Sequence, residues 1–338
     1  MPVIAVDAMG GDFAPEEIVK GVARASLSTQ IECLLVGDER RIQAVLDSVS
    51  YNPAHIGIHH AAEAIGMGES PKEALRAKRD ASIAVGAGLV AKGRADALVS
   101  AGNTGACVLA CAREFRAIKG IRKTALASVF PRQIEYPGQD RLALLLDVGA
   151  TVRCDAPELA QFAVMGSAYA RCVSKVPHPR VGLLNMGAEA FKGGDVLSEA
   201  YARLRAMPGI HFVGNLEGND VAKGKADVIV CEGLLGNVVL KLIEGMADVV
   251  SDVASDAVKQ RLVWRVGMLL LSRGVREIAN LADYAKYGGA PLLGFEQIFL
   301  KAHGRSTAQA IENAVKVAAK AVRDGVADQI ASGIQNVR

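Results

Sequence analysis

The segment VIAVDAMGGD, residues 3–12, carries the pattern from which the fold class is inferred. A short apolar run is followed by Asp7 and by the pair Gly10–Gly11, and Pro15 then precedes apolar residues at helical spacing. The same order of apolar run, polar residue with glycine, and helical spacing recurs. The further runs lie at residues 95–99, 142–146, 181–184, 211–213 and 228–231.

Continuous apolar strands joined by helices are what a parallel sheet covered on both faces requires. We therefore predict a three-layer α/β/α sandwich with a mostly parallel sheet, formed by residues 1–338 as a single domain. Ligands bind beyond the carboxyl ends of strands in such sheets. We expect the six polar turns to lie along one edge of the sheet and to form a binding site there. At any single turn, a glycine that only closes the connection is the alternative.

The composition excludes several classes of protein. The 338 residues are 51% apolar and 22% charged, which excludes a disordered or collagen-like chain. A formal charge of +3 is too balanced for a surface that binds nucleic acid. No apolar stretch reaches the roughly 18 residues of a membrane-spanning helix. The six cysteines form no Cys-x-x-Cys pair, so we expect structural thiols in a cytoplasmic protein that binds no nucleic acid.

The sequence SAGNTGA at residues 100–106 is the strongest candidate for a binding motif. It places small residues and backbone N–H groups at the start of a predicted helix, an arrangement that binds phosphate. The residues predicted to bind phosphate, which we call the phosphate turn, are Ser100, Gly102, Asn103, Thr104 and Gly105. Lys192 is predicted to supply a cation, and an exposed solvated lysine is the alternative.

His303 begins the sequence HGRS at residues 303–306, which we call the His303 turn. A histidine there is suited to act as an acid or base near neutral pH, and a structural histidine is the alternative. Neither a P-loop nor a nucleophile elbow is present in the sequence. No metal site is predicted, because the histidines at 55, 59 and 60 lack an accompanying H-E-x-x-H motif.

Residues 245–287 differ in character and are predicted to form a helical insertion. A helical projection from Lys259 places apolar side chains on one side and four arginines on the other. Such a basic amphipathic helix is typical of one that lies in the interface of an anionic membrane. The side chains predicted to contact the membrane include Val263, Trp264, Leu270 and Leu271. A dimer-packing helix and an ordinary core-facing helix are the alternatives.

Several blocks of sequence resemble one family over essentially the whole chain. They are DAMGGD at 7–12, SAGNTGA at 100–106, LDVGA at 146–150, LLNMG at 183–187, GNLEGND at 214–220, DVIVCEGLLGNVVLK at 227–241, and YGGAPLLGF with HGRS within 287–306. The chain resembles the bacterial phosphate acyltransferase family of phospholipid synthesis. That family converts acyl-[acyl carrier protein] and inorganic phosphate to acyl phosphate.

The resemblance implies a fold similar to isocitrate and isopropylmalate dehydrogenases, and to phosphate acetyltransferase. It implies a homodimer without a cofactor, located in the cytoplasm and docked on the inner face of the cell membrane. The acyl phosphate would pass to a membrane glycerol-3-phosphate acyltransferase.

Phosphate itself can be the nucleophile on a thioester, so the absence of an activated Ser or Cys motif fits this activity. We expect the site to orient phosphate and to stabilise the oxyanion. The candidate donors around the thioester are Asn185, Asn215 and Asn237. Asp7 and Asp147 are predicted to orient these donors, and His303 to protonate the departing thiol. The alternatives are an NAD-dependent hydroxyacid dehydrogenase of the related fold, a phosphate acetyltransferase using coenzyme A, and a non-catalytic scaffold.

Overall fold

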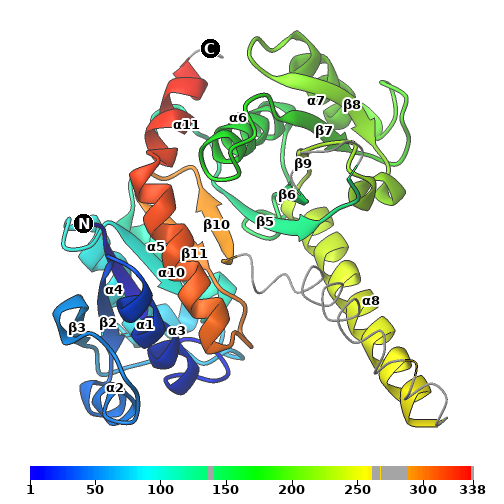
Figure 1. Ribbon diagram of the computed structural model, residues 1–338. Helices are drawn as coiled ribbons and strands as arrows, with labels where there is room; N and C mark the ends of the chain where they lie inside the picture. The colour runs from blue at the N-terminus through cyan, green and yellow to red at the C-terminus, as the bar shows by residue number, and fades with distance from the viewer. Residues whose placement is uncertain (135–140, 261–266, 268–287, 336–338) are drawn as a thin grey trace.

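The computed structural model describes residues 1–134, 141–260, 267 and 288–335. One eleven-stranded sheet runs through the molecule, in the order β3-β2-β1-β4-β11-β10-β5-β6-β9-β7-β8 (Figure 1). The strands of the first half are β1 Val3–Asp7, β2 Glu32–Gly37, β3 Ile56–His60, β4 Ala97–Ser100 and β11 Ile298–Lys301. The remaining strands are β10 Ala290–Leu293, β5 Ala125–Pro131, β6 Leu142–Leu146, β9 Val228–Val230, β7 Arg180–Leu184 and β8 His211–Leu216.

Helices cover both faces of the sheet in each half, which confirms the predicted α/β/α layering. In the first half, α1 Glu16–Ser28, α2 Glu39–Leu46 and α10 Ala308–Arg323 share one apolar core with the sheet. The opposite face packs on α3 Pro71–Ala77, α4 Ser82–Ala91 and α5 Thr104–Glu114. In the second half, α6 Ala156–Cys172, α7 Gly194–Ala206 and α11 Val326–Gln335 cover one face. The first turns of α8 Gly233–Gln260 pack on the other.

The expectation that all six polar turns lie along one edge of a parallel sheet is wrong. Strand β10 is antiparallel to both β11 and β5, and β5 is antiparallel to β6. The parallel strands of the two halves therefore run in opposite directions. Twist between neighbouring strands accumulates at about 20–25° per step. In this arrangement the start of α5 after β4, the turn after β6 and the first turns of α8 after β9 line the same pocket, although β4 and β6 point opposite ways.

The turn after β1 and the phosphate turn approach each other closely at Gly10. A Cβ atom at this position would lie 2.4 Å from Asp7 Oδ2 and 2.8 Å from the backbone nitrogen of Gly102. Only glycine fits there, because any side chain would push the two turns apart. The DAMGGD motif therefore serves to bring the first strand's turn against the phosphate turn.

Helix α8 begins at Gly233, before the predicted insertion at 245–287, and it projects away from the rest of the molecule (Figure 1). The residues predicted to contact a membrane lie outside the described residues; they are Val263, Trp264, Leu270 and Leu271. No helix within the described ranges is long and apolar enough to cross a membrane.

Candidate active site

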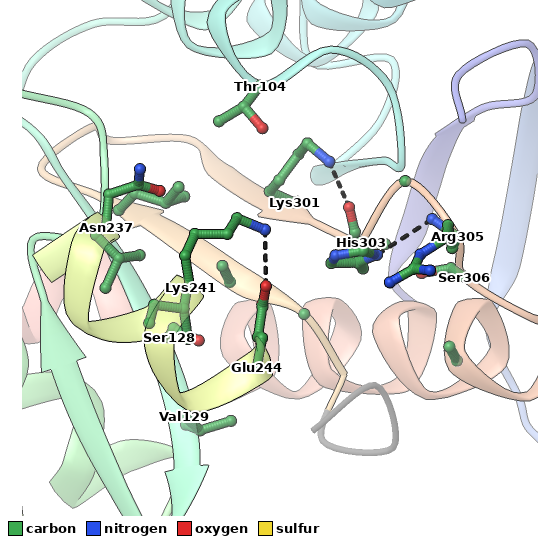
Figure 2. A pocket seen from close by; sticks show the side chains of 18 of the residues that line it. Thr104, Ser128, Val129, Asn237, Lys241, Glu244, Lys301, His303, Arg305 and Ser306 are labelled. Carbon is green, nitrogen blue, oxygen red and sulfur yellow. Dashed lines mark hydrogen bonds and ion pairs between the residues drawn. The ribbon is translucent and has the colours of Figure 1, made fainter. Parts of the chain in front are cut away.

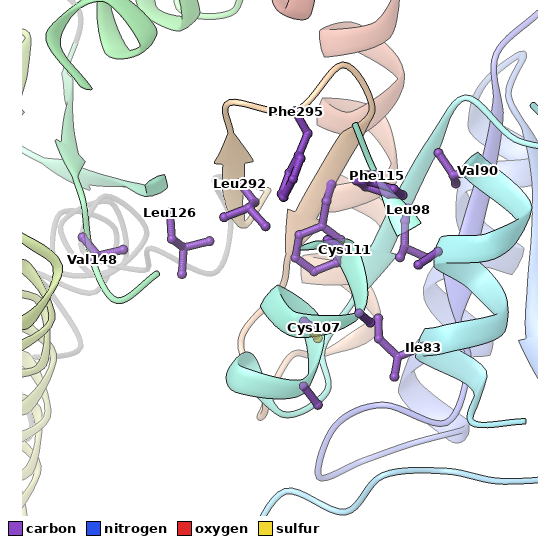
Figure 3. Packing of buried hydrophobic residues seen from close by; sticks show 14 of the residues in the cluster. Ile83, Val90, Leu98, Cys107, Cys111, Phe115, Leu126, Val148, Leu292 and Phe295 are labelled. Atoms are coloured by element: carbon purple, nitrogen blue, oxygen red, sulfur yellow. The ribbon is translucent and has the colours of Figure 1, made fainter. Parts of the chain in front are cut away.

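A pocket of about 330 Å³ lies between the two halves of the sheet. Its walls come from the turns after β1, β4, β6 and β11, from β5, and from the first turns of α8. Figure 2 shows polar and charged side chains from these elements facing one another. Those that line the pocket include Asp12, Thr104, Asn237, Lys241, Glu244, Lys301, His303 and Arg305.

The buried carboxylate of Asp7 holds the phosphate turn in place through Ser100. Asp7 is 2% exposed, and its two oxygens accept hydrogen bonds from Ser82 Oγ at 2.6 Å and Ser100 Oγ at 2.7 Å. Ser100 Oγ accepts in turn from the backbone N–H of Gly102 at 3.0 Å. Burial raises the pKa of the Asp7 carboxyl, and the hydrogen bonds from the two serines oppose that rise. The bonds of Asp7 therefore go to serine hydroxyls and a turn amide, whereas the sequence predicts a role in orienting asparagines.

Asn103 is the N-cap residue of α5. Its Oδ1 accepts from the backbone N–H of Ala106 at 3.1 Å, and its Nδ2 donates to the carbonyls of Met67 and Glu69. The Asn103 amide therefore caps helix α5 and holds the loop that contains Met67 and Glu69. Of the five residues predicted to bind phosphate, Thr104 lines the pocket. It begins α5, whose first N–H groups have no acceptor within the helix and favour an anion.

The His303 turn lies beside the phosphate turn, because β11 and β4 are neighbouring parallel strands. His303 Nδ1 accepts from the backbone N–H of Arg305 at 3.2 Å, which places the proton of the neutral ring on Nε2. Burial lowers the pKa of His303, although Glu244 opposes this effect. A neutral imidazole at pH 7 is a hydrogen-bond donor rather than a strong acid. The geometry thus favours Nε2–H donation over the predicted proton transfer to the thiol.

Helix α8 contributes one polar face to the pocket. Asn237, Lys241 and Glu244 lie on successive turns, and Lys241 Nζ forms an ion pair with Glu244 Oε2 at 2.7 Å (Figure 2). The four-residue spacing from Asn237 to Lys241 places both on one side of a helix. Both lie in the block DVIVCEGLLGNVVLK, so this spacing is a signal from which Lys241 was predictable.

Two more cations of the pocket were not predicted from the sequence. Arg305 extends from the His303 turn, with a side chain 65% exposed and 4.0 Å from the carboxylate of Asp248 on α8. Lys301 is the last residue of β11 and only 7% exposed. Burial lowers the pKa of the Lys301 ammonium, and the neighbouring Cys107 and Asp7 oppose the shift. A lysine at the end of an apolar strand is not marked by any sequence periodicity, so Lys301 was not predictable. Arg305 belongs to the sequence HGRS, which was already a candidate for the site.

Asp147 shapes the turn after β6. Its buried carboxylate accepts from the backbone N–H groups of Leu126, Gly149, Ala150 and Thr151, at distances from 2.7 to 3.0 Å. The turn lies against Asn237, since a Cβ atom at Gly149 would be 3.7 Å from Asn237 Oδ1. Asp147 therefore positions backbone rather than amide side chains, but the turn that it holds adjoins one of the predicted donors.

Asn185 and Asn215 lie outside the lining of the pocket. Asn185 Nδ2 donates to the carbonyl of Lys192 at 2.9 Å, and Asn215 Nδ2 donates to the carbonyl of Glu189 at 2.8 Å. Both amides thus hold the loop at 186–193 against the ends of β7 and β8. The Lys192 ammonium lies 5.8 Å from the ring centre of Phe191. The direct roles in catalysis proposed for Asn185, Asn215 and Lys192 stay predictions.

Comparisons with known proteins agree with the resemblance. A model of the "Fatty acid synthesis protein" family matches residues 3–329. A phosphate acyltransferase from Heliobacterium modesticaldum is 45% identical over 333 residues, covering 98% of this chain and 96% of the relative. One from Dictyoglomus turgidum is 40% identical over 335 residues, covering 99% and 98%.

Solved structures share the fold at low sequence identity. A phosphotransacetylase from Streptococcus pyogenes aligns with a TM-score of 0.64 at 18% identity, covering 95% of this chain and 94% of that one. A 4-hydroxythreonine-4-phosphate dehydrogenase from Klebsiella pneumoniae aligns with a TM-score of 0.52 at 16% identity, covering 95% and 100%. The predicted fold class is confirmed.

Proposed function

This chain belongs to the fatty acid synthesis protein family, whose relatives are phosphate acyltransferases, and on that premise we propose that it transfers a fatty acyl group from acyl-[acyl carrier protein] to inorganic phosphate. The product is an acyl phosphate for phospholipid synthesis. The observation that carries this proposal is the pocket. It combines an N-terminal helix end with the cations Lys241, Lys301 and Arg305.

The two reactants occupy different walls in this proposal. Phosphate lies between the first turn of α5 and Arg305, where helix N–H groups and a guanidinium attract its charge. The thioester carbonyl lies beside Asn237, whose amide donates to the oxyanion that forms on attack. Holding the reactants together lowers the barrier by up to about 7–11 kcal/mol, and one oxyanion donor contributes roughly 2.7–4 kcal/mol. The C–S bond breaks as the phosphate oxygen bonds to the acyl carbon, and the sulfur leaves as a thiolate on the side of His303, whose Nε2–H donates a hydrogen bond to it before water supplies the proton.

The remaining lining of the pocket suits an alkyl group. Met67, Leu126, Val129 and Leu240 contribute apolar side chains to the same space. Burial of methylene groups against them contributes about 0.8 kcal/mol for each CH₂. An acyl chain next to a cationic end is the substrate that this mixture of side chains fits.

A direct test is to incubate the protein with palmitoyl-[acyl carrier protein] and phosphate and to trap the mixed anhydride with hydroxylamine. We expect acyl hydroxamate only when both substrates are present. Preference for acetyl-coenzyme A as the acyl donor would indicate a phosphate acetyltransferase instead. Reduction of NAD with a hydroxyacid, followed spectrophotometrically, would indicate a dehydrogenase.

We further propose that two copies of the chain pair through α8. Its exposed apolar residues follow a four-three-four spacing, which is typical of a helix that packs against another helix. These residues, which we call the α8 seam, are Leu242, Met246, Val249 and Val253, each between 54% and 64% exposed. Exposure of such a row of apolar side chains to water is unfavourable in a monomer, and a second copy of the helix would bury it.

Charge introduced into the α8 seam is expected to separate the dimer. Leu242→Asp with Met246→Asp places two carboxylates in the contact, so we expect a monomer in sedimentation velocity where the wild-type chain gives a dimer. Ser255→Asp is the matched control, because Ser255 is exposed on α8 but lies off the seam. A dimer that survives the double substitution would contradict pairing through this line.

The residues that follow α8 in the sequence include the apolar side chains predicted to contact a membrane. We propose that the segment with Val263, Trp264, Leu270 and Leu271 rests on the anionic inner face of the cell membrane, near a membrane glycerol-3-phosphate acyltransferase that receives the acyl phosphate. Leu270→Glu with Leu271→Glu is expected to abolish co-sedimentation with anionic liposomes, because two charges remove the apolar contact. The Ser255→Asp variant should still co-sediment. Equal co-sedimentation of the double variant and the wild-type chain would contradict membrane contact there.

A further inference from the structure

Lys301 joins the phosphate turn and the His303 turn, which lie next to each other at one end of the pocket. It pairs with Ser100 in the parallel register of β11 and β4, so the phosphate turn and the His303 turn leave the sheet side by side. The Lys301 ammonium donates to the carbonyl of Ala101 at 3.2 Å and also to the carbonyl of Ala302. Figure 2 shows Lys301 between Thr104 and the His303 turn.

The Ala101–Gly102 peptide is held on both sides. Its carbonyl oxygen accepts from Lys301, and its N–H donates to Ser100 Oγ at 3.0 Å. The serine is itself fixed by Asp7, and all three of these side chains are at least nine-tenths buried. Glycine rotates about its backbone bonds at little steric cost, so these hydrogen bonds decide the orientation of the peptide.

That orientation matters for an anion. With its oxygen bonded to the Lys301 ammonium, the Ala101 carbonyl has its partial negative charge paired with a cation, next to the first turn of α5 and its N–H groups. A rotated peptide would place a carbonyl oxygen beside the anion and displace Thr104.

We propose that Lys301 is a positioning residue that holds the phosphate turn and the His303 turn in the arrangement that binds an oxyanion. An ammonium group suits this task because one atom carries three N–H donors for carbonyls of two separate turns. The inference rests on the proposed function for the identity of the anion as inorganic phosphate.

The test is equilibrium dialysis of the full chain with radiolabelled inorganic phosphate, together with initial rates against each substrate. Lys301→Met is expected to bind phosphate at least about tenfold more weakly than the wild-type chain, and its KM for phosphate should rise by a similar factor. Its KM for the acyl donor should change less than about twofold. Lys301→Gln keeps two N–H donors and should recover part of the affinity. Lys92→Met, an exposed lysine at the end of α4, is the control and should match the wild-type chain.

Phosphate affinity of Lys301→Met within twofold of wild type would overturn the proposal, as would a wild-type chain that binds no phosphate. If Lys301→Met does not fold, Ser100→Ala removes the other bond of the same peptide; weaker phosphate binding there supports the proposal, and unchanged binding overturns it. If the wild-type chain binds phosphate, Lys301→Met weakens that binding and no acyl phosphate forms, the proposed function is refuted and the role of Lys301 stands.

Discussion

Asp147→Ala is expected to lower the free energy of unfolding by about 3 kcal/mol, because four backbone N–H groups lose their acceptor. The bond from Leu126 is buried and the three from the turn are part-buried, so the turn bonds contribute about 0.5 kcal/mol each and the Leu126 bond more. The carboxylate is fully buried and joins β5 to the turn after β6. Loss of a buried network on this scale is among the few causes of so large a destabilisation. Urea denaturation followed by circular dichroism measures the change.

Two further variants make this stability prediction specific. Asp147→Asn keeps one acceptor oxygen but turns an NH₂ group toward N–H donors, so it should also destabilise the chain, though less than alanine. Asp80→Ala removes an exposed carboxylate at a turn and should change the free energy of unfolding by less than about 0.5 kcal/mol. A loss below about 1 kcal/mol for Asp147→Ala would show that water replaces the carboxylate and that the turn does not depend on it.

Asn237→Ala is expected to lower kcat about 100- to 1,000-fold, because it removes the proposed oxyanion donor. The affinity for phosphate should change little, since Asn237 lies on the α8 wall and the proposed phosphate position is on the α5 wall. Initial rates with acyl-[acyl carrier protein], measured across phosphate concentrations, separate kcat from KM.

Asn237→Asp is the matched variant for shape. It preserves the size of the side chain but replaces the N–H donors by a negative charge, so kcat should fall at least as far as in Asn237→Ala. Activity of either variant within tenfold of wild type would contradict the role of Asn237 as the oxyanion donor.

The six apolar runs were sufficient to predict the layers of the fold, because a strand buried on both faces leaves a continuous apolar signal. The direction in which two strands pair leaves no such local signal. The antiparallel pairings of β10 with β11 and β5, and of β5 with β6, together reverse the strand direction between the halves, and they were therefore not predictable from apolar spacing. The same reversal explains why the polar turns do not share one edge.

The sequence was sufficient to predict which turns contain candidate site residues, but not which of their side chains point into the pocket. The sequence placed Asn185, Asn215 and Asn237 at strand ends or helix starts, yet only the tertiary packing determines that Asn237 alone of these lines the pocket. Lys301 stood in a segment that is otherwise apolar, IFLKA at 298–302, where nothing distinguishes a buried ammonium from a solvated one. Its role depends on the carbonyl of Ala101, which lies 200 residues earlier in the turn after β4.

The measurement that tests the account most directly is a crystal structure of the protein soaked in inorganic phosphate. We predict phosphate in the pocket, within hydrogen-bonding distance of the first N–H groups of α5 and of the Arg305 guanidinium. Phosphate found only beside Lys192, at the loop that Asn185 and Asn215 hold, would contradict the placement of the reaction in this pocket.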